Sequence, residues 1–216
     1  MKKNRDIVLL GGGGHCCAVI DVIECDGSFS VAGIVDKREL VGTDVLGYPI
    51  FGTDEELTKL IDTYQQFAIT VGHLHSNATR VRLFDLILSM GGVFPVIASP
   101  RAYISRHASI GAGSVIMHQS VVNAKAVIGK NGIVNTGAVL EHEAVIGHHC
   151  HISTGAYING GCTVEDNVFI GSNAVIRQGV NVGKNAVIGA GAVVISDVKA
   201  DGVYAGNPAV FKRSIQ

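Results

Sequence analysis

Aliphatic residues recur at every sixth position through the second half of the chain. The series reads Ile104, Ile110, Ile116, Val122, Ile128, Val134, Leu140, Ile146, Ile152, Ile158, Val164, Ile170, Ile176, Val182, Ile188 and Val194. A small or slim side chain follows four residues later, at Ala108, Ser114, Ser120, Ala126, Gly132, Ala138, Ala144 and Cys150. A period of six predicts one short strand and one corner per hexad, so three hexads form a triangular coil of about 18 residues. The series therefore predicts a parallel β-helix of about five coils, stacked about 4.8 Å apart, with the aliphatic side chains in its core.

In the first half, short apolar runs alternate with segments of helical spacing. We expect strands at 7–10, 31–36 and 67–72, a glycine turn at 11–14, helices at 16–24 and 78–90, and a turn into a helix over 47–61. Alternating strands and helices predict a parallel sheet. We therefore expect an α/β domain with a small parallel, Rossmann-like sheet over residues 1–98. The β-helix domain and a short C-terminal tail follow over residues 99–216.

The composition argues against a nucleic-acid-binding, membrane-spanning or secreted protein. The 216 residues carry a formal net charge of −1, which provides no basic field for nucleic acid or an anionic membrane. Hydrophobic residues make up 47% of the chain, yet no apolar run is long enough to cross a bilayer. The start MKKNRDIVLLGGGGH is interpreted as a first strand rather than a signal peptide. The five cysteines, an odd number without framework spacing, are expected to be reduced thiols in a cytoplasmic protein.

The glycine turn Gly11–Gly14 lies where a β-α-β unit can bind phosphate, because its N–H groups can approach an anion at the N-terminus of the next helix. The dinucleotide fingerprint G-x-G-x-x-G/A is incomplete, since Cys16 or Cys17 takes the place of the third small residue. This disfavours a hydride-transfer enzyme. Asp36, at the end of the second strand, can accept hydrogen bonds from a ribose or a base. A purely structural turn and an exposed carboxylate are the alternatives.

The stretch LEHEAVIGHHCHIS, residues 140–153, concentrates histidines and glutamates. Residues about 18 apart stack on adjacent coils, so His142 is expected between Ala124 and Gly160, which leave room beside the imidazole. His151 lies half a coil from His142 and therefore on another side of the filled prism. This offset predicts active sites shared between subunits of a homotrimer.

A metal site is the alternative interpretation of this stretch. His148, His149 and His151 are too close in sequence to converge on one ion, because neighbouring strand residues point in opposite directions. There is no Cys/His pair at structural-zinc spacing either, so we expect no metal requirement and place His148 and His149 at an exposed corner. A neutral imidazole beside a carboxylate suits a general base instead.

Apolar residues also stand one place before several core positions. They include Val121, Val127, Ile133 and Val139. We expect them at or near the corners and exposed, and patches of this kind mark interfaces. The pattern supports the homotrimer.

Several motifs together resemble one family. They are GGGGH, IVD, SPRAYIS, the unbroken hexads, NTGAVLEHEAVIG, HISTGAYINGG and the closing AGNPA. Over nearly the whole chain the sequence is similar to bacterial nucleotide-sugar N-acetyltransferases, which are hexapeptide-repeat enzymes of the bacillosamine (UDP-4-amino-sugar) and GDP-perosamine types. The resemblance implies a left-handed β-helix and acetyl-CoA as co-substrate. It further implies acetylation of a nucleotide-linked 4-amino-4,6-dideoxy sugar for glycan or polysaccharide biosynthesis.

The resemblance also implies site residues. It makes His142 the base that deprotonates the attacking amine, and Glu143 the carboxylate that orients this base. The residues implied to contact acetyl-CoA are His151, Ser172 and Ala190, and those implied to contact the nucleotide-sugar are Gly13, Gly14, His15, Asp36, Lys37, Asn135 and Gly160. Lys184 is expected, on charge, to meet the phosphates of CoA, with a solvated basic surface as the alternative.

One departure from the family concerns the segment TVGHLH, which replaces a more usual IGDN after the third strand. His73 stands where an aspartate is common, so the nucleotide stays open among UDP, dTDP and GDP. Acetylation of a sugar hydroxyl, as in sialic-acid enzymes, and a non-catalytic nucleotide-sugar scaffold are the alternative functions. The intact pair of His142 and Glu143 disfavours the scaffold.

Overall fold

The computed structural model describes residues 5–73 and 76–215. The chain forms two compact units, Met1–Ala98 and Ser99–Gln216. Two residues of the segment TVGHLH, Leu74 and His75, lie outside the described residues. Among the described helices, none combines the length and the apolar character that a membrane crossing requires.

The first unit is an α/β domain built on a five-stranded sheet in the order β3-β4-β2-β1-β5. Its elements are β1 (Asp6–Leu10), α1 (Gly14–Asp26), β2 (Ser30–Val35), η1 (Arg38–Leu40), β3 (Asp44–Val45), β4 (Tyr48–Gly52), η2 (Asp54–Glu56), α2 (Leu57–Thr63), β5 (Gln66–Ile69), α3 (Ala78–Ser89) and β6 (Ile97–Ala98). Strand β1 pairs in parallel with β2 and β5, and β2 pairs in parallel with β4. The predicted α/β class is confirmed, although antiparallel β3 makes the sheet mixed.

The sequence pattern did not predict the β3–β4 hairpin of this unit. A turn leading into a helix was expected over 47–61, whereas the structure has strand β4 before α2. Leu46 and Gly47 form a two-residue turn with φ of 54° and 83°, and Asp44 Oδ1 accepts the N–H of Gly47 at 2.9 Å. Pro49 hides the strand from the pattern, because proline is rare inside strands; it precedes Ile50, the first residue of β4 that is in register with β2.

A buried apolar cluster holds the sheet and its helices together. It contains Val8, Leu10, Val35, Leu57, Phe67, Ile69, Leu83, Phe84, Ile87 and Phe94. Helix α1 ends at Gly27, whose φ of 67° lets its N–H reach the carbonyl of Ile23 at 2.9 Å. These contacts fix the sheet edge from which the glycine turn leaves β1.

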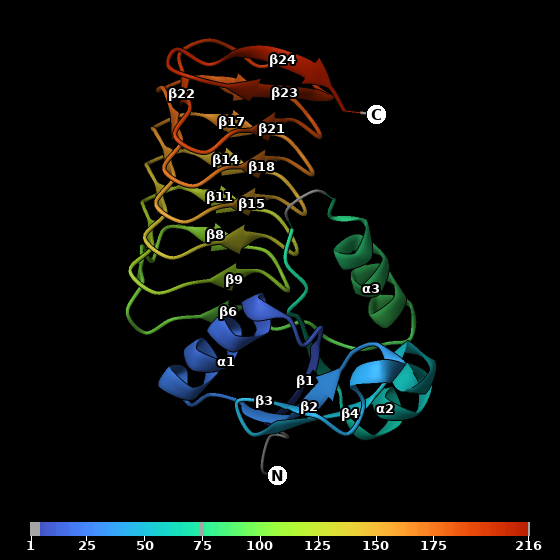
Figure 1. The fold of residues 1–216 in the computed structure, drawn as a ribbon. Coiled ribbons are helices and arrows are strands. Elements are labelled where there is room, and N and C mark those ends of the chain that lie inside the picture. The colour runs from blue at the N-terminus through green and yellow to red at the C-terminus, as the bar shows by residue number, and fades with distance from the viewer. Residues whose placement is uncertain (1–4, 74–75, 216) are drawn as a thin grey trace. The chain divides into compact units, whose positions relative to one another are not determined.

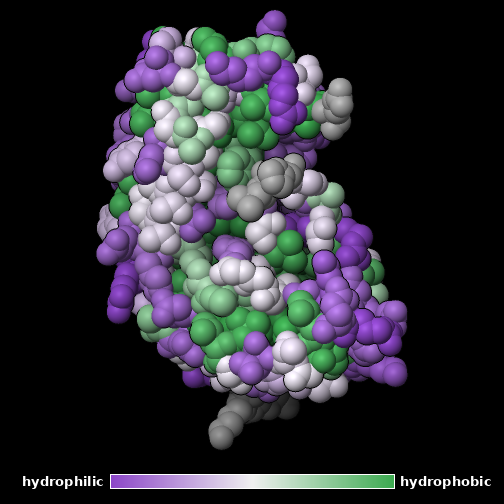
Figure 2. Space-filling model, in the orientation of Figure 1, coloured by the Kyte–Doolittle hydropathy of each residue, from purple (hydrophilic) through white to green (hydrophobic). Residues whose placement is uncertain are grey.

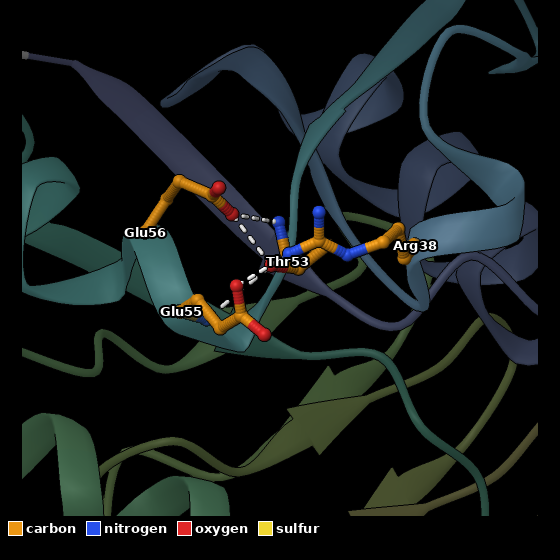
Figure 3. Close-up of polar contacts among 4 residues, drawn as sticks. All are labelled: Arg38, Thr53, Glu55 and Glu56. Carbon is orange, nitrogen blue, oxygen red and sulfur yellow. Dashed lines mark hydrogen bonds and ion pairs between the residues drawn. The ribbon is translucent and has the colours of Figure 1, made fainter.

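A capping box forms the entry to η2 and α2 (Figure 3). Glu56 Oε2 accepts from both the N–H and the hydroxyl of Thr53, each at 2.6 Å, while Thr53 Oγ1 accepts the N–H of Glu55 at 3.3 Å. Glu55 also pairs with Arg38 on the surface. The hydrogen bonds from Thr53 are the main reason why the pKa of Glu56 lies below its ordinary value.

The second unit is a parallel β-helix whose stacked strands run from green to red in Figure 1. Its coil strands are β7 (Tyr103–Ile104), β8 (Ser109–Ile110), β9 (Val115–Ile116), β10 (Val121–Val122), β11 (Val127–Ile128), β12 (Ile133–Val134), β13 (Val139–Leu140), β14 (Val145–Ile146), β15 (His151–Ile152), β16 (Tyr157–Ile158), β17 (Thr163–Val164), β18 (Phe169–Ile170), β19 (Val175–Ile176), β20 (Asn181–Val182), β21 (Val187–Ile188) and β22 (Val193–Val194). Every one of these strands ends on a member of the aliphatic series, so the hexad prediction is confirmed.

Three sheets form the faces of this prism. One has the order β22-β19-β16-β13-β10-β7 and another β20-β17-β14-β11-β8, while the third includes β23-β21-β18-β15-β12-β9. Partners stand one coil apart, as in Val121 with Val139 and Val127 with Val145. After the last coil, β23 (Gly202–Ala205) pairs with β21 and then with antiparallel β24 (Val210–Ser214). Register therefore determines which corner residues lie above one another.

The corners carry a second six-residue series that the sequence reading missed. From Gly113 to Gly191, one residue of each corner has a left-handed backbone, and most of these residues are Gly or Asn. They are Gly113, Gln119, Lys125, Asn131, Gly137, Glu143, His149, Gly155, Gly161, Asn167, Asn173, Gly179, Asn185 and Gly191. Glycine and asparagine adopt this conformation at the lowest cost. The other side chains at these positions are therefore exceptions to the pattern.

The core of the prism follows the predicted series, and its first members are half-buried. From Ile116 to Val194 the aliphatic residues are at most 2% exposed. Ile104 and Ile110 are half-buried, and their strands β7 and β8 each pair with a single coil neighbour, β10 and β11. The small residues beside them, such as Ala126 and Ala144, are fully buried. Large side chains would not fit at these places.

The expected exposed apolar series is only partly present. Val121, Val127, Ile133 and Val139 begin strands rather than corners, and Ile133 is 1% exposed, so the expectation is wrong for that residue. Val127 is 41% exposed, and Val121 and Val139 are half-buried. Other exposed apolar residues of this unit include Tyr103, Val145 and Tyr157. Apolar patches also interrupt the polar surface on the face drawn in Figure 2.

Candidate functional site

His142 lies on an exposed corner between strands β13 and β14. Its side chain is 58% exposed. The ring packs against the backbone of Gly160, one coil later, where a Cβ would lie 2.6 Å from Cε1 and 2.7 Å from Nε2 of the imidazole. The expected stacking of His142 on Gly160 is therefore present, and the missing side chain of Gly160 makes room for the ring.

The carboxylate of Glu143 lies between the imidazole of His142 and the ammonium group of Lys125. Its Oε2 is 3.6 Å from Nδ1 of His142, and its Oε1 accepts a hydrogen bond from Nζ of Lys125 at 3.0 Å. The ammonium of Lys125 lowers the pKa of Glu143, and the contact with His142 lowers it further. Glu143 is therefore an ionised group beside the ring, as a carboxylate that orients a base must be. Lys125 was not identified from the sequence.

Asn135 and His151 form a hydrogen-bonded pair across adjacent coils. The side-chain Oδ1 of Asn135 accepts the N–H of Thr136 at 2.8 Å, so its Nδ2 is the atom that faces Nε2 of His151 at 3.2 Å. Nε2 then accepts, and the ring carries its proton on Nδ1. His151 is 6% exposed and packs edge-on against Phe169 with ring centroids 5.2 Å apart. The two residues were expected to contact different ligands.

Of the residues expected to bind acetyl-CoA, His151 and Ser172 follow one another on paired strands β15 and β18 and the corner after them, whereas Lys184 lies apart. Ser172 lies beside Ser153, with their hydroxyl oxygens 3.0 Å apart, and Ala190 is exposed one coil beyond Ser172. Lys184 belongs to another corner, where its N–H donates to Oε2 of Glu165 at 2.7 Å. His151 stands on strand β15, in a different sheet from β13 and β14, which flank His142. The two histidines thus face different sides of the prism, as the half-coil offset predicted.

The neighbouring histidines His148 and His149 differ in exposure. His148 is exposed, and its Nδ1 accepts the N–H of Lys130 at 3.0 Å. His149 is only half-exposed, because it stacks one coil above Asn131, whose Nδ2 lies 3.0 Å from its Nδ1. The expectation that both histidines are exposed is therefore wrong for His149.

In the first unit, the glycine turn and Asp36 are joined directly. Asp36 Oδ2 accepts a short hydrogen bond from the N–H of Gly12, and Oδ1 accepts the N–H of Lys37 at 2.7 Å. Gly13 precedes the first residue of α1, and a Cβ on Gly13 or Gly14 would meet no atom within 4 Å. The turn is thus open at its tip, as a phosphate-binding loop requires. The carboxylate of Asp36 has a structural partner in addition to any ligand.

Two other expected residues lie near this turn. His15 lies in the first turn of α1 and is half-buried. It lies beside Gly72, where an added Cβ would be 3.9 Å from the Cβ of His15. His73, the departure from the family pattern, is 5% exposed. Arg80, which sequence reading did not single out, is 1% exposed and donates from one guanidinium nitrogen to the carbonyls of Ile69 at 3.0 Å and Val71 at 2.6 Å. It ties α3 to the end of β5.

Comparison with family models matches both units. The model of the PglD N-terminal domain matches residues 6–87. A bacterial transferase hexapeptide model, with six repeats, matches residues 143–178, and a model of the hexapeptide repeat of succinyl-transferase matches residues 161–196. A search of curated protein sequences gives no match.

Solved structures are similar over almost the whole chain. A mutant of perosamine N-acetyltransferase from Caulobacter crescentus, in complex with CoA and GDP-perosamine, is 31% identical over 97% of each chain, with a TM-score of 0.91. The acetyltransferase domain of PglB from Neisseria gonorrhoeae FA1090, in complex with acetyl coenzyme A, is 32% identical over 97% of this chain and 100% of its own, with a TM-score of 0.89. WeeI from Acinetobacter baumannii AYE is 26% identical over 95% and 99%, with a TM-score of 0.86.

Proposed function

The chain belongs to the PglD-type family of nucleotide-sugar N-acetyltransferases with hexapeptide repeats, and we propose that it acetylates a nucleotide-linked 4-amino-4,6-dideoxy sugar. It is an acetyltransferase that uses acetyl-CoA. The observation that carries the proposal is the corner at His142, where an exposed imidazole lies over Gly160 and beside the ionised carboxylate of Glu143. GDP-perosamine, the ligand of the Caulobacter relative, is an example of the substrate class.

In the proposed reaction, the sugar amine attacks the thioester carbonyl carbon of acetyl-CoA. The neutral ring of His142 takes the proton that the amine nitrogen loses as the new C–N bond forms. The C–S bond then breaks, the sulfur leaves with the proton returned by the imidazolium, and the products are the N-acetyl sugar and CoA. Glu143 orients the ring and stabilises the imidazolium, and general-base help of this kind is typically worth about 10²–10⁴ in rate.

Ligand positions follow the residues that the family resemblance implies. Backbone groups of Gly13 and Gly14, at the start of α1, are proposed to face the diphosphate, and His15, Asp36 and Lys37 the rest of the nucleotide. Near the reacting atoms, Asn135 and Gly160 would contact the sugar. The strip proposed to bind acetyl-CoA contains His151, Ser172 and Ala190, with Lys184 near the CoA phosphates.

We infer that the active enzyme is a homotrimer. His142 and the strip with Ser172 and Ala190 lie on different corners of one prism, so a single chain cannot bring them to one substrate. A neighbouring prism related by a threefold axis can supply the second half of the site. The exposed apolar residues Val127 and Val145 support an interface along the prism.

The test is thiol release from acetyl-CoA with a panel of nucleotide-linked 4-amino sugars and their 4-hydroxy analogues, carrying UDP, dTDP or GDP. We expect release with at least one amine and none with the hydroxyl analogues. Release only with hydroxyl substrates would make the protein an O-acetyltransferase. His142→Ala should lower kcat/KM by about 10²–10⁴ with an unchanged fold. Wild-type turnover in this variant would contradict the assignment of the base.

A further inference from the structure

Lys125 occupies a corner position with a left-handed backbone, which lysine rarely adopts. It is one of the few residues of the left-handed corner series that is neither Gly nor Asn, with φ of 61°. Glu143, one coil later, is another, with φ of 62°. Side chains other than Gly and Asn are disfavoured in this conformation, so a pair of them in directly stacked positions indicates a use for both side chains.

Register brings these two exceptions together. Strands β10 and β11, which flank Lys125, pair with β13 and β14, which flank Glu143. Each corner is held by the coil before it: the N–H of Lys125 donates to the carbonyl of His107, and that of Glu143 to the carbonyl of Ala124. Two stacked residues with the same backbone conformation leave the corner in the same direction. Their side chains therefore meet, with Nζ 3.0 Å from Oε1.

The two oxygens of the Glu143 carboxylate face different partners. Lys125 holds Oε1, which leaves Oε2 on the side of Nδ1 of His142, at 3.6 Å. Without Lys125, an exposed glutamate side chain would be free to rotate away from the ring. An exposed ion pair adds little to folding stability, so stability alone does not explain why both residues occupy unfavourable backbone positions.

We propose that Lys125 is a positioning residue that holds the carboxylate of Glu143 against the catalytic imidazole. The proposal rests on the proposed function, in which His142 is the base. Lys125 acts through Glu143 and not on the substrate. The lowered pKa of Glu143, for which Lys125 is the largest cause, agrees with this role.

A double-mutant cycle tests the coupling. Wild type, Lys125→Met, Glu143→Gln and the double variant are compared for kcat and for both KM values. Lys125→Met should lower kcat about twofold to fivefold, the range of an exposed ion pair, and leave both KM values unchanged. In the Glu143→Gln background the same change should have no effect on kcat, and Lys125→Arg should restore it. Lys130→Met, which removes an exposed lysine at another corner, is the matched control and should keep wild-type kinetics.

Three results would overturn the proposal. An unchanged kcat in Lys125→Met would mean that Lys125 does not position Glu143. An equal loss of kcat in the wild-type and Glu143→Gln backgrounds would mean that Lys125 acts without Glu143. A raised KM would mean that Lys125 contacts a ligand. A titration of the Glu143 carboxyl carbon by NMR gives a readout without turnover. Its pKa should return toward the ordinary value in Lys125→Met and stay low in Lys125→Arg and Lys130→Met. If His142→Ala keeps full activity while this titration behaves as expected, the proposed base is wrong and the positioning of Glu143 by Lys125 stands.

Discussion

The imidazole of His142 packs on the α-carbon of Gly160, the residue that follows it by one coil of the prism. A methyl group on Gly160 would lie 2.6 Å from Cε1 and 2.7 Å from Nε2 of the ring, closer than real contacts allow. A glycine here has no positive φ to explain it. Gly160 is needed here because the absence of a side chain leaves space for the imidazole of His142.

Gly160→Ala should therefore displace His142 without unfolding the prism, because the exposed ring can swing away. Displacement of the base should lower kcat/KM about tenfold to 100-fold, because misplacement by about 1 Å can lower a rate by about 10². The measurement is steady-state kinetics with a circular dichroism check of the fold. The matched control is Gly52→Ala, where the nearest atom to the new Cβ is 3.6 Å away. Equal kinetics in the two variants would show that the space beside the ring is not required.

Much of this geometry follows from one period in the sequence. Because the hexads are never interrupted, each aliphatic position predicts a strand and each pair 18 residues apart predicts a contact, as for His142 and Gly160. The same spacing also predicts the contact of Lys125 with Glu143, because these two corner residues are 18 apart as well. The left-handed corners would have drawn attention to both, since Gly and Asn dominate that series.

Other features depend on contacts that no local pattern encodes. Strand β4 contains Pro49 and is only five residues long, so its pairing with β2 is visible only in the folded sheet. The burial of Ile133 and the half-burial of His149 likewise depend on neighbours brought in by tertiary structure. The hydrogen bond from Asn135 to His151 joins two motifs that the family resemblance assigned to different ligands.

The pair of Asn135 and His151 predicts a fixed tautomer. Since Nδ2 of Asn135 donates to Nε2, the ring should carry its proton on Nδ1 near neutral pH. Asn135→Asp replaces this donor by an acceptor, so Nε2 should become the donor and carry a proton in the variant. Nitrogen-15 chemical shifts of the imidazole distinguish these forms, and Asn135→Ser serves as a smaller, neutral control. A proton on Nε2 in the wild type would contradict the assigned hydrogen bond.

The five free cysteines should differ sharply in reactivity. Burial raises the pKa of Cys16 to about 11 and that of Cys150 to about 12, and it also raises the pKa of Cys162. At pH 8 these three thiols hold almost no thiolate, so they should resist a disulfide reagent. Exposed Cys25 should react first, and half-buried Cys17 more slowly.

Time-resolved labelling of the native protein, followed by peptide mass spectrometry, checks this order. Cys25→Ser should remove the fast phase and leave the slower one, while addition of denaturant should expose all thiols in both proteins. Rapid native labelling of Cys150 would contradict the burial of the prism core.

The capping box should make stability depend on pH through Glu56. Hydrogen bonds from Thr53 lower the pKa of Glu56 below its ordinary value, so the folded state binds this proton less readily than the unfolded state does. The stabilisation is then complete above the unfolded pKa and is lost as the pH falls through the folded pKa. Glu56→Gln should lower the unfolding midpoint at pH 7 and make little difference at pH 2. Thr53→Val should weaken the same pH dependence, and a constant difference between wild type and Glu56→Gln at all pH values would contradict this account.

The last prediction concerns active sites shared between subunits. His142 and exposed Ala190 lie on different corners of the prism, so the proposed trimer places His142 of one chain against the cofactor strip of the next. His142→Ala and Ala190→Trp should each keep at most about 1% of wild-type activity, the first without its base and the second with its strip blocked. In a mixed trimer, one interface of the three joins an intact base to an intact strip. Random co-assembly of equal amounts should therefore restore about a quarter of wild-type activity. Co-expression with two different affinity tags isolates the mixed trimers, and separately purified variants combined without exchange should stay inactive. An active monomer in light scattering, or mixed trimers without activity, would rule out the shared site.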